Sequence, residues 1–231
     1  MGERSEKAYE KVISYIKNEI RQGNLKRGES LPPERELAEL LGVSRNSVRE
    51  AVRTMSLMGF VSSVQGAGNF VTCDLEKNLS ESLRIMLQLG ETNYLQVSQM
   101  RRGLESETAR LAASHILPGQ LTRLENLVQR MEEAHDPEQG SRYDQEFHIL
   151  LCDAAGNRLL KAMFTGMLST VNDFIATMYA HIMAEEAQGN ALHAAHREIV
   201  DALRAHDETA AIRAIWRHFE IVNAAIARYH I

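Results

Sequence analysis

The chain has 231 residues, 44% apolar and 25% charged, so it is long enough to bury a core and is unlike a disordered or fibrous sequence. No apolar run of about 18 residues occurs, which excludes a transmembrane helix and argues against a membrane partner. Two cysteines are too few for a disulfide framework, and the first residues lack a signal-peptide core, so we expect a cytoplasmic protein. The net charge of −5 argues, at first sight, against a nucleic-acid partner.

Turn-forming residues and charge both divide the chain near residue 74. Two prolines and a cluster of three glycines fall before this point, whereas long helical periodicity follows it. Residues 1–74 contain 11 basic and 10 acidic side chains, and residues 75–231 contain 15 basic and 21 acidic ones. We therefore expect a mainly α protein, with an N-terminal module over 1–74 and an all-helical domain over 75–231.

Three helices and a hairpin are expected in the N-terminal module. Apolar positions at helical spacing predict the helices, and glycines mark where the first two end. The third helix begins at one of two serines, because each has a side chain suited to capping. The first helix is expected at residues 5–22, the second begins at Pro33, and the third begins at Ser44 or Ser47. The two strands of the hairpin are expected at 60–65 and 69–72.

The third helix carries arginines on the face opposite its apolar residues. Arg45, Arg49 and Arg53 recur at every fourth position, while Val48 and Val52 face inward. A guanidinium group can pair with guanine edges or grip phosphate oxygens. Two helices joined by a short turn, the second with such a row, predict a helix-turn-helix, and the hairpin predicts its wing. For the arginine spacing alone, a solvated basic helix face is the alternative.

Four motifs occur in order between residues 8 and 72, at 19–28, 31–38, 41–51 and 66–71. Together they resemble the winged-helix domain of the GntR family of transcriptional regulators. The resemblance implies that Arg45 and Arg49 work in the major groove of DNA and that the glycine tip of the hairpin reaches toward the minor groove. The DNA-contacting positions that it implies are Arg35, Ser44, Arg45, Arg49, Gln65 and Gly66.

Apolar stripes predict about seven helices in the C-terminal part, packed on one another around a core. They are expected at residues 76–89, 93–115, 119–134, 138–154, 157–183, 185–206 and 208–229.

One aspartate and three histidines interrupt the apolar stripes of three of these helices. Asp144 and His148 are four residues apart on one face, and His196 and His218 lie in stripes of their own. A divalent metal would satisfy all four buried groups at once. The alternative is a set of hydrogen-bonded core histidines, and His193 competes with His196. The remaining histidines are expected at the surface: His115, His135, His181, His206 and His230.

The motifs at 101–105, 144–148, 156–157 and 196–199, together with His218, resemble the FCD ligand-binding domain of the FadR subfamily. The resemblance implies that Asp144, His148, His196 and His218 are the ligands used by the metal-binding branch, which argues against a fatty acyl-CoA effector. Zn, Ni, Mn and Fe all suit such a set. Arg101 is expected to face inward, either to clamp an effector carboxylate or to pair with Glu105 one turn on.

These features predict a DNA-binding transcriptional regulator rather than an enzyme. A homodimer is expected to read an inverted-repeat operator in double-stranded DNA, and a small organic acid bound near the metal is expected to control operator affinity. The alternatives are a metal-dependent enzyme with an accessory DNA-binding module, and a regulator whose metal is purely structural.

Overall fold

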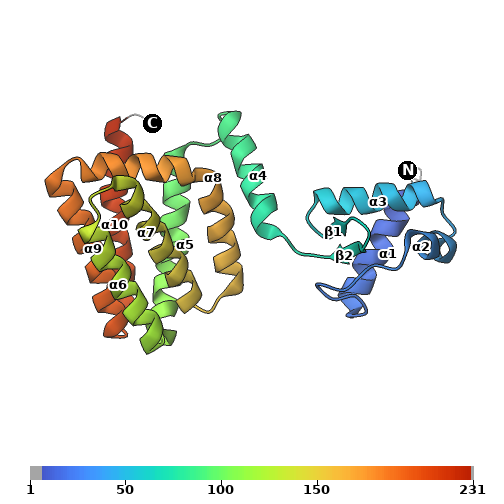
Figure 1. Ribbon diagram of the computed structural model, residues 1–231, viewed down its shortest axis with the longest axis horizontal. Coiled ribbons are helices and arrows are strands. Elements are labelled where there is room, and N and C mark those ends of the chain that lie inside the picture. The colour runs from blue at the N-terminus through green and yellow to red at the C-terminus, as the bar shows by residue number, and fades with distance from the viewer. Residues whose placement is uncertain (1–6, 230–231) are drawn as a thin grey trace, which may run out of the picture. The chain divides into compact units, whose positions relative to one another are not determined.

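The computed structural model describes residues 7–229, so residues 5 and 6 of the first predicted helix, and His230, lie outside the described part. Within it the chain forms two compact units that divide between Asn78 and Leu79. Helices dominate both units, and the only strands in the described residues form one small hairpin (Figure 1). The mainly α fold predicted from the sequence is confirmed, whereas the domain boundary at residue 74 stays a prediction.

The N-terminal unit consists of three helices and the hairpin. Its core is formed by the inward faces of the helices, where Val12, Ile16, Leu37, Val48 and Met55 are fully buried. The winged helix-turn-helix order predicted from the sequence is therefore present. Its elements are α1 (Ala8–Gln22), α2 (Glu34–Leu41), α3 (Arg45–Leu57), β1 (Val61–Val64) and β2 (Gly68–Val71).

The hairpin is antiparallel, with Val61 paired to Val71 at its base and Val64 paired to Gly68 near its tip. The two base valines are buried against the helices, whereas the tip is exposed. This arrangement fixes the hairpin to the helices at one end and leaves the other end free to reach a partner.

The C-terminal unit contains a helix bundle whose helices agree with the predicted ranges to within two residues. Proline or a capping side chain starts several of them; the Asn157 side chain, for example, accepts hydrogen bonds from the Leu159 and Leu160 amides. The first of these helices, α4, begins in the N-terminal unit. The helices are α4 (Leu75–Gln88), α5 (Tyr94–His115), α6 (Pro118–Glu133), α7 (Pro137–Ala154), α8 (Arg158–Met183), α9 (Glu186–Arg204) and α10 (Glu208–Tyr229).

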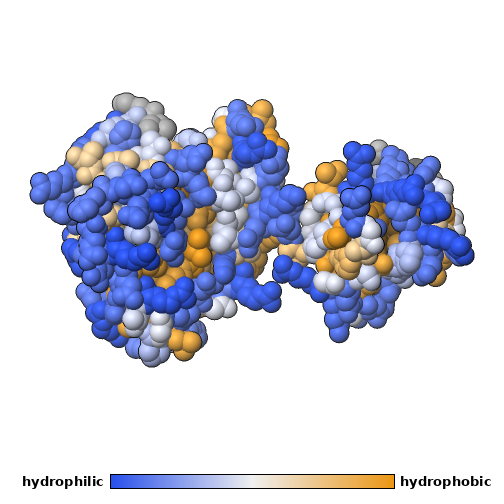
Figure 2. All heavy atoms as spheres, in the orientation of Figure 1, coloured by the Kyte–Doolittle hydropathy of each residue, from blue (hydrophilic) through white to orange (hydrophobic). Residues whose placement is uncertain are grey.

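Most helices of the bundle bury one face in a shared core. Phe147, Leu151, Ile199 and Phe219 from α7, α9 and α10 are fully buried, and α5 packs against all three of these helices. The exception is α4, in which no residue is buried. Hydrophobic residues gather at its C-terminal end, where Figure 2 shows them among polar neighbours. In the described residues, no helix combines the length and apolar character needed to cross a bilayer.

Candidate functional site

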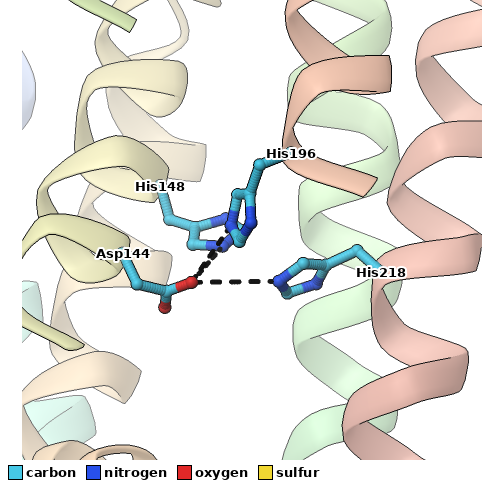
Figure 3. A group of neighbouring side chains, drawn as sticks. All are labelled: Asp144, His148, His196 and His218. Carbon is cyan, nitrogen blue, oxygen red and sulfur yellow. Dashed lines mark ion pairs between the residues drawn. The ribbon is translucent and has the colours of Figure 1, made fainter. Parts of the chain in front are cut away.

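Four polar side chains meet inside the bundle, and they are the four singled out in the sequence. Asp144 and His148 project from α7, His196 from α9 and His218 from α10 (Figure 3). All four residues are at least 95% buried, and each offers one ligand atom within 4.8 Å of the others. The bundle thus brings together residues that are widely separated in the chain.

The three imidazoles are aimed at one carboxylate oxygen. The Nε2 atom of His196 lies 3.0 Å from Asp144 Oδ1, and those of His148 and His218 lie 3.8 and 4.0 Å from it. In the described part of the chain, none of these Nε2 atoms has a well-aligned hydrogen bond. Burying unsatisfied polar atoms costs free energy, and a divalent cation would satisfy all of them. The donor set, one carboxylate oxygen and three imidazole nitrogens, fits such an ion.

A second layer of contacts holds two of the imidazoles. The Nδ1 atom of His196 donates to the Leu192 carbonyl oxygen at 3.0 Å, which leaves Nε2 free as a ligand. On the opposite side, Nδ1 of His148 lies 2.5 Å from Glu105 Oε2. Partners of this kind orient a ligating histidine and fix the nitrogen that carries the proton.

Glu105 is the residue that the sequence reasoning missed at this site. The sequence indicates it only as an ion-pair partner of Arg101, and that pair is present: Arg101 Nε donates to Glu105 Oε1 at 3.0 Å, and Nη2 lies 2.9 Å from the same oxygen. Glu105 is fully buried on α5 and contacts His148 with its other oxygen. The sequence signal was an acidic residue on the inward face of a helix, four positions from an inward arginine.

The charges of the cluster perturb its pKa values strongly. Burial by itself lowers the pKa of His148, but the carboxylates of Glu105 and Asp144 outweigh it and raise this pKa to about 9. Burial also lowers the pKa of His218, to about 4, and Asp144 offsets this only in part. For Glu105, burial raises the pKa, but the charges of His148 and Arg101 outweigh this effect and lower the pKa to about 2. Burial also raises the pKa of Asp144, but the charge of His148 and hydrogen bonds from the histidines lower it well below its usual range. Both carboxylates are therefore ionised at neutral pH.

Arg101 lies at the border between the cluster and a cavity. The cavity is lined by Arg101, Asp144 and His218 together with apolar residues of α5, α8, α9 and α10. Glu105 engages Nε and Nη2 of the arginine, and no described residue pairs with Nη1. The two readings of Arg101, as a clamp and as an ion-pair partner, are thus compatible, because a guanidinium group has five N–H donors.

The other histidines stand apart from the cluster. His193 is half-buried on α9, and its Nε2 lies 3.5 Å from the Tyr179 hydroxyl. His115, His135 and His206 are exposed, as expected. His181 is half-buried rather than fully at the surface, because its ring stacks on Tyr229.

The predicted DNA-contacting residues all lie in the N-terminal unit. The side chain of Ser44 accepts a hydrogen bond from the Ser47 amide, which places the start of α3 at the earlier of the two serines. Arg45 and Arg49 follow on the exposed face of the helix, opposite the buried Val48.

The remaining predicted positions flank this helix. Gln65 and Gly66 are exposed in the turn of the hairpin, where Gly66 has a φ of +78°, a conformation that glycine adopts without strain. Arg35 pairs with Glu39 along α2, and Arg49 pairs with Glu34 across to α2. Both ion pairs are exposed, so a phosphate or a base can compete for the arginines.

The chain combines a winged helix-turn-helix with a helical domain that holds a buried polar cluster. This combination defines a class of two-domain protein, the DNA-binding regulators with a sensor domain. The family comparisons agree. Residues 8–71 match the family described as bacterial regulatory proteins, gntR family, and residues 96–221 match the FCD domain. The chain belongs to the GntR family of transcriptional regulators and carries an FCD effector-binding domain.

Relatives with the same architecture support this assignment. The transcriptional regulator LutR of Bacillus subtilis (strain 168) is 30% identical over 91% of this chain and 97% of its own length. The Uxu operon transcriptional regulator of Escherichia coli (strain K12) is 27% identical over 97% of this chain and 89% of its own length. A solved GntR structure from Streptococcus agalactiae has a TM-score of 0.67 at 28% identity, covering 94% and 99% of the two chains. These relatives are transcriptional regulators, not enzymes.

Proposed function

We propose that this regulator binds a divalent metal through Asp144, His148, His196 and His218 and that a small organic acid bound beside the metal controls its affinity for operator DNA. The observation that carries the proposal is the convergence of three imidazole Nε2 atoms and one carboxylate oxygen in a buried cluster that also lines a cavity. Zn, Ni, Mn and Fe remain the candidate metals, since the ligand types suit each of them.

Both the bound metal and Arg101 would contact the carboxylate of the acid. When bound, the metal would supply positive charge and open coordination positions for carboxylate or hydroxyl oxygens of the effector. Arg101 would donate to the same carboxylate through Nη1, and its orientation is fixed by Glu105 and by the rings of Phe164 and Phe219, 5.6 and 5.3 Å away.

At the other end of the chain, Arg45 and Arg49 would enter the major groove, and Gly66 would approach the minor groove. Arg35, Ser44 and Gln65 complete the proposed contacts. A homodimer would place two such helices on an inverted repeat, since a two-fold protein reads two half-sites. For control, the acid must bind one conformation of the dimer more tightly than the other, and it thereby shifts the placement of the two winged helices.

The proposal is tested by measuring operator binding with and without acids on metal-loaded protein. DNA selected by the full-length protein from a random library serves as the operator, and size-exclusion chromatography with light scattering gives the oligomeric state. We expect a candidate acid to change DNA affinity without being consumed and to lose its effect after chelation. In elemental analysis, His218→Ala should reduce bound metal, whereas His193→Ala should not.

Three results would contradict the proposal. Full metal occupancy in His218→Ala would refute the ligand set. An effector response that persists after complete removal of the metal would favour a purely structural metal, and steady turnover of an acid would favour an enzyme.

A further inference from the structure

The cavity beside the metal cluster has a mainly apolar lining. Arg101, Asp144 and His218 contribute polar groups to it. The rest of the wall is mostly apolar, with Val171, Ile175 and Met178 contributed by α8 and further aliphatic residues by α5, α9 and α10. Its other polar side chains are Ser98, Tyr94 and Tyr179. The space between the lining atoms, including its mouth open to solvent, measures about 510 Å³.

The few polar groups on the apolar wall are poorly placed to serve a polar ligand. The Ser98 hydroxyl already donates to Asn223 Oδ1 at 2.6 Å. Tyr94 and Phe174 both line the cavity and stack on each other with ring centroids 3.8 Å apart. The Tyr179 hydroxyl lies 3.5 Å from His193 Nε2. A ligand with several hydroxyl groups would leave water without recovering its hydrogen bonds, at a cost of about 1–3 kcal/mol for each unsatisfied group.

We propose that the effector is a monocarboxylate with an apolar body, branched aliphatic or aromatic, and that this wall discriminates against polyhydroxylated and very small acids. The inference rests on the proposed function and narrows it from organic acids in general to one chemical class. The carboxylate would lie against Arg101 and the metal, and the body would lie against α8. Each methylene buried on that wall strengthens binding about fourfold.

The test compares acids that share a carboxylate and differ in the body attached to it. Lactate, 2-hydroxy-4-methylpentanoate and glucuronate are titrated into metal-loaded full-length protein by calorimetry. We expect 2-hydroxy-4-methylpentanoate to bind on the order of 50-fold more tightly than lactate, because it buries three more carbons. Glucuronate should bind most weakly of the three.

A conservative variant of the wall checks that the cavity sets this preference. Val222 lines the cavity and is only partly buried, so Val222→Thr should fold. Its hydroxyl places a polar oxygen where an apolar body would lie, so the preference for 2-hydroxy-4-methylpentanoate over lactate should fall. Val200→Thr is the matched control, because Val200 packs in the core and does not line this cavity.

The outcomes separate the two proposals. Binding of lactate or glucuronate as tight as that of 2-hydroxy-4-methylpentanoate would overturn the apolar-body inference and leave the effector site standing. Binding of none of the three acids would overturn the effector site and this inference with it. An unchanged preference in folded Val222→Thr would show that the wall does not select the ligand.

Discussion

Glu105 joins the two chemical parts of the candidate site. One of its oxygens accepts from Arg101 and the other lies against Nδ1 of His148, so a single carboxylate positions both the proposed effector clamp and a proposed metal ligand. All three residues are at least 94% buried. In such an environment a carboxylate interacts strongly with its partners, and losing it leaves the arginine unpaired.

Replacing Glu105 should therefore weaken metal binding without touching a ligand. In Glu105→Gln the amide keeps the shape of the side chain but loses the charge that holds His148. We expect a loss of 10–100-fold in metal affinity, as is typical when an outer partner of a ligating histidine is removed. Competition with a chromophoric chelator measures the affinity.

Glu107→Gln is the matched control for this substitution. Glu107 lies on the same helix, is about half exposed and pairs with Arg110. Equal metal affinities for Glu105→Gln and wild type would show that Glu105 only balances the charge of Arg101.

The four cluster residues were predictable from sequence, whereas Glu105 was not. Polar residues within apolar stripes indicate an inward direction, and that signal sufficed for Asp144 and the three histidines. Periodicity gives the face of a helix but not the helix packed against that face. The contact of Glu105 with His148 depends on how α5 packs against α7, and nothing in the spacing of either helix specifies it.

In the N-terminal unit, Arg45→Ala should weaken specific operator binding by about 1–3 kcal/mol. Arg45 is exposed on α3, and its side chain has no ion pair or hydrogen bond within the described residues, so the fold should be unaffected. Fluorescence anisotropy with the selected operator measures the change. Arg142→Ala, an exposed arginine of α7, serves as the control. Normal operator affinity in Arg45→Ala would refute the assignment of α3 as the recognition helix.

At the scale of elements, local chemistry explains why the helix boundaries were predictable. Proline begins α6 and α7, and Asn157 caps α8, so each start is encoded by residues adjacent in sequence. The start of α3 was ambiguous because Ser44 and Ser47 have the same capping chemistry. The structure resolves it: the Ser44 hydroxyl caps the Ser47 amide, so the second serine lies inside the first turn.

The cap of α8 can be tested without disturbing the core. Asn157→Ala should lower the free energy of unfolding of the C-terminal unit by about 1 kcal/mol, since two amides lose their acceptor. Asn157→Asp should retain most of the stability, because aspartate caps as well as asparagine. Urea denaturation followed by circular dichroism measures both variants. Equal stability of Asn157→Ala and wild type would show that water replaces the cap at no cost.

At the scale of the whole molecule, the sequence average concealed the arrangement of charge. The net charge of −5 combines a nearly neutral N-terminal part with an acidic C-terminal part. DNA recognition depends on a few arginines on one helix face, and an average over the chain does not report their placement. The charges of the two parts taken separately are therefore more informative than the net charge of the chain.

Because each unit has its own core, the metal should stabilise only one of them. The proposed ligands belong to α7, α9 and α10, whereas the N-terminal core is formed by α1, α2, α3 and the hairpin. Free metal at 1,000 times Kd stabilises the unit that binds it by about 4 kcal/mol. For a domain of this size, this corresponds to a rise in Tm of roughly 10 °C. Calorimetry of the full-length protein should show two unfolding transitions, of which chelation lowers one.

Variants of two histidines on α9, His193 and His196, show which transition responds to the metal. His196→Ala should leave both transitions insensitive to the chelator, because the substitution removes a ligand. His193→Ala should keep the wild-type response, since His193 lies outside the cluster. A chelator that lowers both transitions equally would mean that the metal stabilises the N-terminal unit as well, and a sensor confined to the C-terminal unit would then be wrong.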